Sequence, residues 1–306
     1  MRLGVVLAVV GSCLMAATHV AARKVSPRPR AAFVELDALV ADDNGRPARG
    51  LHQADFQIKE DGQPVTVTNF TEVSAAGISG GDEDRRTVVL LLDDVGRRPT
   101  GTLIVPGIAR LFISRARPFD NLAVIRQSHH DDEAVGDLAA ALARIDEYRG
   151  GSVPDFGRET IEDLLKTVAR AARQWEPLAH RRKNLVCIGT HTVCNRYLQV
   201  STHTLLWPFW VDALAAAARA NLSVYTVDPS GVRGQLALEG GLVDRTGGAA
   251  FVSNNYEDAV RRVWDDAGQY YLLGYEPTAR ARELHSIEIK VKGAGLHVRA
   301  RQSRGD

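Results

Sequence analysis

The middle of the chain alternates short apolar runs with amphipathic stretches, which predicts an α/β domain. Thr87-Val-Val-Leu-Leu-Leu-Asp-Asp94 is an apolar run that ends in two carboxylates. A run this short and this uniform is typical of a strand buried on both faces of a parallel sheet. Similar runs recur at 121–125, 184–188, 222–227 and 249–252, and stretches of helical period lie between them, at 103–117, 138–145, 161–175, 209–220 and 256–264. The pattern predicts a doubly wound, mostly parallel sheet over residues 86–268, with its first helix becoming regular near Pro106.

On each side of this domain, apolar and polar residues alternate with a period of two, which is typical of strands with one buried face. The first such segment is 31–73, with turn sequences at 42–45 and 61–62, and the second is 269–303. Each segment is too small to bury its apolar faces alone. We therefore predict that the two segments pair into one small β-sandwich-like module, into which the α/β domain is inserted. Residues 74–85, rich in Gly, Ala, Ser and acids, are the predicted linker.

The first 22 residues have the pattern of a secretory signal peptide, with Arg2, an apolar run at 3–10 and small residues near 20–22. Residues 23–30, which contain two prolines, are then a disordered tail. Two alternatives stay open: lipidation of Cys13 in a bacterial lipoprotein signal, or an uncleaved anchor. Each of these places the folded part outside the cytoplasm, as a secreted, periplasmic or cell-envelope protein. The sequence contains no further apolar run long enough for a transmembrane segment.

The overall charge of the chain is nearly balanced. There are 38 basic and 37 acidic residues, for a formal net charge of +1. Because no segment concentrates basic side chains, we expect no nucleic-acid partner. The sequence contains no Gly-x-Ser-x-Gly elbow and no phosphate-cradling glycine loop after the first buried strand, so we expect no enzymatic activity. A hydrolase on a doubly wound sheet is retained as an alternative.

Five segments carry a resemblance to a known family: residues 50–62, 88–93, 220–229, 246–251 and 270–275. Their order and spacing resemble a von Willebrand factor A domain, and in particular the secreted bacterial VWFA-related subfamily that has β-strands before and after that domain. The resemblance implies a central, mostly parallel sheet wrapped by helices. It also implies that a ligand or partner binds at the carboxyl-terminal edge of the sheet, often through a divalent metal, without catalysis.

The metal site implied by the resemblance is incomplete in this sequence. The family holds its metal with Asp-x-Ser-x-Ser after the first strand, a Thr from a later loop and an Asp after the fourth strand. Asp93 matches the first Asp, but Val95 and Arg97 stand at the two Ser positions, and Ser152 stands at the Thr position. Gly and Thr, at 189–190, stand where the second Asp is expected. Two oxygen ligands of the kind that Mg²⁺ prefers are lost and a cation is gained, so we expect no cofactor.

We therefore predict a non-catalytic interaction or adhesion-type module with a degenerate metal site, which binds a protein or another extracellular macromolecule directly. The predicted contact residues are polar and lie near the carboxyl ends of the strands: Asp93, Asp94, Arg97, Ser152 and Thr190. The alternative is a divalent-metal-dependent adhesion domain that holds Mg²⁺ with Asp93 and Ser152.

Two further groups of metal-ligating residue types occur in the sequence. His129-His-Asp-Asp132 follows the second strand, and we predict a solvated polar loop there, because consecutive side chains point in different directions; a transition-metal site is the alternative. Cys187, His191, Cys194 and His203 are of the type that binds zinc tetrahedrally. For the cysteines we expect unpaired thiols, with a zinc site and a Cys187–Cys194 disulfide as the alternatives.

Overall fold

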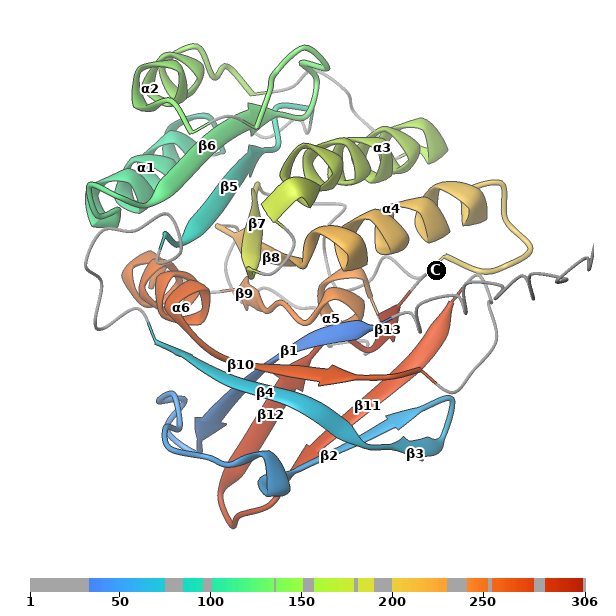
Figure 1. Ribbon diagram of the computed structural model, residues 1–306. Helices are drawn as coiled ribbons and strands as arrows, with labels where there is room; N and C mark the ends of the chain where they lie inside the picture. Colours follow the sequence, from blue (N-terminus) through green and yellow to red (C-terminus); the bar gives the residue numbers. More distant parts are fainter. Residues whose placement is uncertain are drawn as a thin grey trace, which may run out of the picture. The chain divides into compact units, whose positions relative to one another are not determined.

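A five-stranded parallel sheet is the centre of the fold (Figure 1). The computed structural model describes residues 33–74, 85–95, 101–134, 136–150, 157–178, 181–189, 200–229, 241–252, 255–277 and 284–304, all within one unit, 32–306. The strand order is β6-β5-β7-β8-β9, and every neighbouring pair is parallel. The strands are β5 (Thr87–Leu92), β6 (Asn121–Arg126), β7 (Lys183–Ile188), β8 (Leu222–Asp228) and β9 (Ala250–Val252). The predicted α/β class with a parallel sheet flanked by helices is confirmed.

Helices cover both faces of this sheet because its strands are apolar on both faces. In β5, Val88, Leu90 and Leu92 pack into one core cluster, whereas Val89 and Leu91 pack into the other. Helices α1 (Gly101–Arg115), α2 (Leu138–Asp146) and α6 (Tyr256–Gly268) contribute to the first cluster. The second cluster is completed by α3 (Arg158–Trp175), α4 (Trp207–Ala220) and α5 (Leu242–Thr246), and a short 3₁₀ turn, Glu176–Leu178, follows α3.

Three helices differ from the sequence-based expectation: α1, α2 and α5, of which α5 was not predicted. Helix α1 begins at Gly101 and contains Pro106, so the prediction that its regular part starts near the proline was wrong. A proline inside a helix removes one backbone hydrogen bond, and the burial of the α1 face that includes Phe112 offsets that loss. In α2, Leu138 and Leu142 are exposed, whereas Ile145 is buried as expected.

Two antiparallel four-stranded sheets form a β-module with its own core. Their orders are β12-β1-β10-β4 and β13-β11-β2-β3. The first sheet consists of β1 (Val34–Asp42), β4 (Val67–Ser74), β10 (Gln269–Tyr275) and β12 (Leu296–Ala300). The second consists of β2 (Phe56–Glu60), β3 (Gln63–Val65), β11 (His285–Val291) and β13 (Ser303–Arg304), with a 3₁₀ turn at Gln53–Asp55 before β2. Strands from the two ends of the chain share both sheets: β1, blue in Figure 1, lies between β10 and β12, and β2 pairs with β11.

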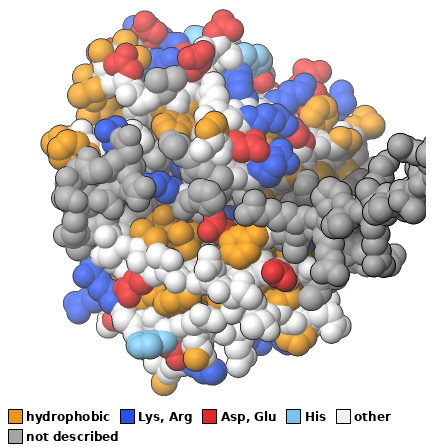
Figure 2. All heavy atoms as spheres, viewed as in Figure 1, with side chains coloured by type: hydrophobic (Ala, Val, Ile, Leu, Met, Phe, Trp, Pro, Cys, Tyr) orange, Lys and Arg blue, Asp and Glu red, His pale blue; other side chains and the backbone are white. Residues whose placement is uncertain are grey.

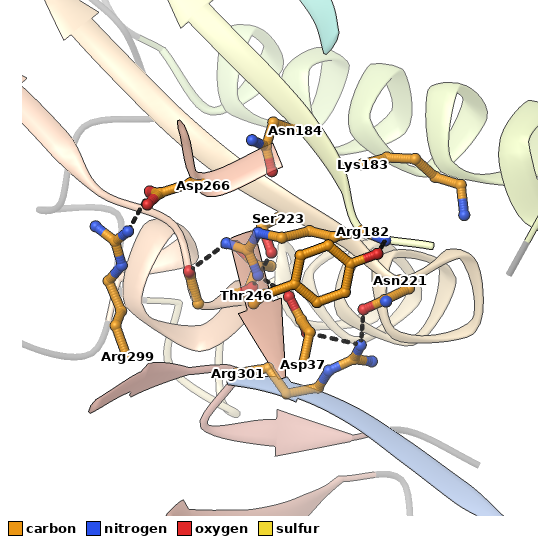
Figure 3. A network of polar contacts seen from close by, with 12 residues as sticks. Asp37, Arg182, Lys183, Asn184, Asn221, Ser223, Thr246, Asp266, Arg299 and Arg301 are labelled. Atoms are coloured by element: carbon orange, nitrogen blue, oxygen red, sulfur yellow. Dashed lines mark hydrogen bonds and ion pairs between the residues drawn. The ribbon is translucent and has the colours of Figure 1, made fainter. Parts of the chain in front are cut away.

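Buried charged and polar groups join the parallel sheet to the β-module (Figure 3). Arg182, which precedes β7, forms an ion pair with Asp37 of β1, and both side chains are fully buried. Arg182 Nη2 also donates to the hydroxyl of Tyr225 at 2.8 Å and to the carbonyl of Gly247 at 2.8 Å. Burial raises the pKa of Tyr225 to about 12, so this hydroxyl stays protonated and donates to Asp266 at 2.9 Å.

Arg301, in the link between β12 and β13, extends the same network from the β-module side. Its guanidinium bonds to Asp37, Asn221 and the carbonyl of Ala218. Burial, followed by the nearby Arg182, lowers the pKa of Arg301 to about 10. Because removal of one partner from such a network leaves a buried charge uncompensated, these contacts fix how the two parts pack.

The surface carries both signs of charge. Figure 2 shows basic and acidic side chains intermingled on the face that it presents, with hydrophobic side chains among them. None of the described helices has both the length and the apolar composition that crossing a membrane requires.

Candidate functional site

The carboxyl ends of the parallel strands meet at one edge of the sheet, and Asp93 lies at that edge. The register aligns Leu92 with Arg126 of β6 and with Ile188 of β7, so the residues that follow these strands become neighbours. The backbone N–H of Asp93 donates to the carbonyl of Ile188 at 3.0 Å. Ligands in open α/β sheets bind just beyond such an edge, which makes it the candidate site.

Asp93 is held in place from several sides and is only 6% exposed. Its carbonyl oxygen accepts a 2.7 Å hydrogen bond from the Tyr148 hydroxyl, and its carboxylate Oδ1 accepts one of 3.3 Å from the backbone of Val95. Burial raises the pKa of Tyr148, and the negative charges of Asp93 and Asp94 raise it further. The phenol therefore stays protonated and remains a donor. These contacts make Asp93 a residue that fixes the edge.

Gly189, the first residue after β7, packs directly against the Asp93 side chain. A Cβ at position 189 would lie 2.3 Å from the Asp93 Cβ and 2.6 Å from its Oδ2. The position where the family resemblance implies a second Asp ligand thus has no side chain and no room for one. Among the described residues, the donor set around Asp93 does not fit Mg²⁺, which needs several converging oxygen ligands.

Asp94 holds the beginning of the loop that follows β6 through hydrogen bonds. Its carboxylate accepts hydrogen bonds from the backbone N–H of Ser128 at 2.8 Å and from the Ser128 hydroxyl at 2.5 Å. The ring Nδ1 of His129 lies 3.1 Å from the same carboxylate. The Asp94 side chain is only 7% exposed, so its charge is used within the protein.

The buried Asp132 holds the other end of this loop. Arg126 bonds to Asp132 through its backbone N–H at 2.9 Å and through its side chain at 2.8 and 3.0 Å. Arg144 of α2 adds a 3.2 Å ion pair. Burial alone would raise the pKa of Asp132, but the hydrogen bonds from Arg126 outweigh it and lower the pKa. Residues 128–131 are thus a short exposed segment between two fixed ends.

No model of a known protein family matches the sequence, and a search of curated proteins gives no match. The chemistry of this edge therefore has to be inferred from its own residues. Among the predicted contact residues, Asp93 and Asp94 lie side by side at the edge. Arg97, Ser152 and Thr190 lie outside the described residues.

Residues 129–132 are the first of the two groups of metal-ligating residue types in the sequence. In the loop after β6, His129 and His130 are exposed, as expected for a solvated loop, but they pair with Asp94 and with Asp163 of α3, at 2.7 Å for the second pair. The expectation that the whole loop is solvated was wrong for Asp132, which is buried. No group of three or more potential metal ligands occurs within the described parts of the chain.

Cys187 is disulfide-bonded and 1% exposed in β7, so its sulfur is not a thiolate ligand for zinc, and the expectation of an unpaired thiol there was wrong. Cys194 and His191 lie outside the described residues, whereas His203 is exposed.

Sequence reasoning missed the residues that hold the edge together. Tyr148 is 55 positions away from Asp93 along the chain, and no local pattern links them. Ser128 carried a weak signal, because it comes three residues after the predicted strand 121–125 and therefore close to the Asp93 edge. Gly189 was noted only as a missing ligand, although its lack of a side chain is what allows β7 to approach Asp93.

Proposed function

We propose that the chain is a secreted, non-catalytic interaction module of the von Willebrand factor A type that binds a macromolecular partner at the carboxyl-terminal edge of its parallel sheet. The observation that carries the proposal is the loop of residues 128–131, which is anchored at one end by Asp94 and at the other by Asp132. A loop fixed at both ends loses little conformational entropy when a partner binds.

The roles of the residues follow from their exposure. The carboxylates of Asp93 and Asp94 are almost fully buried, so they position the edge and leave the contact with a partner to others. The side chains of His129 and His130 are 48% and 63% exposed, and Asp131 is exposed beside them. Imidazole and carboxylate groups on a fixed loop suit a partner surface that offers both hydrogen-bond donors and acceptors.

The proposed binding does not need a metal. Gly189 fills the space beside Asp93, and the Asp94 carboxylate already accepts three hydrogen-bonding contacts from Ser128 and His129. A divalent-metal-dependent adhesion domain would need these carboxylates to face a cation. The two functions therefore predict opposite responses to a chelator.

The test is a pulldown from a cell-envelope extract of the source organism with the immobilised protein. The loop variant His129→Ala/His130→Ala/Asp131→Ala is compared with Asp43→Ala/His297→Ala. The second variant removes an exposed His–Asp pair, joined at 2.8 Å, from the β-module.

We expect a partner that the wild-type protein and the control variant retain equally, and that the loop variant retains about tenfold less, as the loss of a few contacts at an interface produces. EDTA should leave its recovery unchanged. Equal recovery by the loop variant would refute the proposal. Recovery that is lost in EDTA and restored by Mg²⁺ would favour the metal-dependent alternative instead.

Secretion is tested separately. Fractionation of the source organism should place the protein in the periplasm, the envelope or the medium, and a cytoplasmic location would contradict this part of the proposal.

A further inference from the structure

A polar cavity of about 420 Å³ lies between helix α5 and the strands β11 and β12. Its volume is in the range of small-molecule sites, which begins near 300 Å³. The lining includes Arg301, which also reaches Asn221, the residue before β8. The cavity is therefore on the side of the amino-terminal ends of the parallel strands, opposite to Asp93, and it is independent of the function proposed above.

Among the described residues, three arginines but only two acids line this cavity: Arg245, Arg299 and Arg301 against Asp244 and Glu288. Two of the arginines are engaged with acids that lie outside the lining. Arg301 bonds to Asp37 and Arg299 to Asp266, and both contacts can be followed in Figure 3. Glu288 has its own partner, since Lys290 lies 2.9 Å from its carboxylate.

Arg245 differs from the other two arginines. It is half-buried, and within the described part of the chain its side chain has neither a hydrogen bond nor an ion pair, although its backbone N–H and C=O are bonded to Gly241 and Gln302. None of the Arg245 side-chain nitrogens is among the buried atoms that lack a partner, so the guanidinium reaches solvent and is open to a ligand. In addition, the Nε of Arg299 is buried without an acceptor among the described residues.

We propose that this cavity binds a small anionic ligand, a carboxylate or phosphate compound, with Arg245 as its principal contact. A guanidinium presents a planar fork of N–H donors that matches the oxygen atoms of both groups. Arg245 supplies this fork, and Arg299 and Arg301, which are paired with Asp266 and Asp37, line the same space. Gln302 and Ser286 line the same space with uncharged polar groups that suit the rest of a small polar ligand.

The test is isothermal titration calorimetry of the full chain with inorganic phosphate in one arm and malonate in the other, at constant ionic strength. Arg245→Met removes the fork and the charge. Arg245→Lys keeps the charge without the fork. Arg110→Met is the matched control, because it removes one exposed arginine that pairs with Asp146 far from the cavity. The Arg245 side chain has no described partner to lose, so both variants should fold, and circular dichroism checks this.

We expect saturable binding of at least one of the two anions. The affinity should fall at least about tenfold in Arg245→Met, less in Arg245→Lys, and not in Arg110→Met. The arm that binds identifies the class of ligand as phosphate or carboxylate. The proposal is overturned if neither anion gives saturable binding up to about 20 mM, beyond which affinity falls below any useful range. It is also overturned if Arg245→Met binds as tightly as the wild-type protein.

Discussion

Lys183 makes the stability of this protein depend on pH in a window where most side chains do not titrate. The residue is the first of β7 and is 0% exposed. Its Nζ donates to the carbonyl of Ala220 at 2.6 Å and to that of Arg181 at 2.8 Å. Burial lowers the pKa of Lys183 from 10.5 to about 7, and the charges of Arg301 and Arg181 act in the same direction. The folded protein therefore releases this proton near pH 7, whereas the unfolded chain keeps it up to about pH 10.5.

Between these two values the unfolded chain binds the extra proton, so the free energy of unfolding should rise with pH. The slope is at most about 1.4 kcal/mol per pH unit, and the gap between the two pKa values corresponds to about 5 kcal/mol. Below pH 7 Lys183 is charged in both the folded and the unfolded state, so the full free-energy cost of burying the charge lowers the stability of the folded protein. Lys183→Met has a similar shape and cannot titrate. It also leaves two carbonyls without their donor, which costs about 1–3 kcal/mol at every pH.

The measurement is urea denaturation of both proteins from pH 6 to pH 10, followed by tryptophan fluorescence. The variant should be the less stable protein at pH 10 and should match or exceed the wild-type protein at pH 6. Other titrating groups cancel in the difference between the two curves. Lys290→Met, which removes a lysine whose side chain is 64% exposed, is the control and should show a flat difference. Parallel curves for the wild-type protein and Lys183→Met across the window would refute the reasoning.

Three further predictions concern single contacts. Gly189→Ala should lower the free energy of unfolding by about 1–3 kcal/mol, because its Cβ would overlap the Asp93 side chain, and an unchanged thermal midpoint would contradict this packing. Asp37→Asn leaves the buried Arg182 without its counter-charge and should cost about 3–5 kcal/mol in chemical denaturation; a loss below about 1 kcal/mol would show that the pair is not buried as described. Tyr148→Phe removes the hydroxyl that bonds to the Asp93 carbonyl and should cost about 1 kcal/mol, and equal stability of the two proteins would mean that this bond contributes nothing.

The parallel sheet was readable from the sequence because burial on both faces leaves a local signal. Each residue of β5 from Thr87 to Leu92 is buried, and a run of apolar residues records this directly. The start of α1 was not readable, because Pro106 is normally a signal for a helix start. Here the buried helix face outweighs the loss of one hydrogen bond, and only packing against the sheet decides that.

The structure changes which residues matter for the proposed function. The sequence placed Asp93 and Asp94 after a strand and hence at a sheet edge. It gave no sign that the Asp94 carboxylate would be turned toward Ser128, or that Gly189 would pack against Asp93. The exposure of a residue depends on the neighbours that folding brings around it. The sequence alone therefore does not distinguish a charged residue that contacts a partner at a sheet edge from one that holds a loop in place there.

By itself, the sequence determined the strands of the parallel sheet and the helices that flank it, apart from α5, and it led to the prediction that neither flanking segment folds alone. Tertiary structure decided the rest: β1 lies between two strands from the other end of the chain, and Arg182 meets Asp37 across 145 positions of sequence. The local pattern of apolar and polar residues reflects whether each residue is exposed to solvent or buried in the core. Pairings between distant residues leave no local trace, because they arise only when separately formed elements pack together.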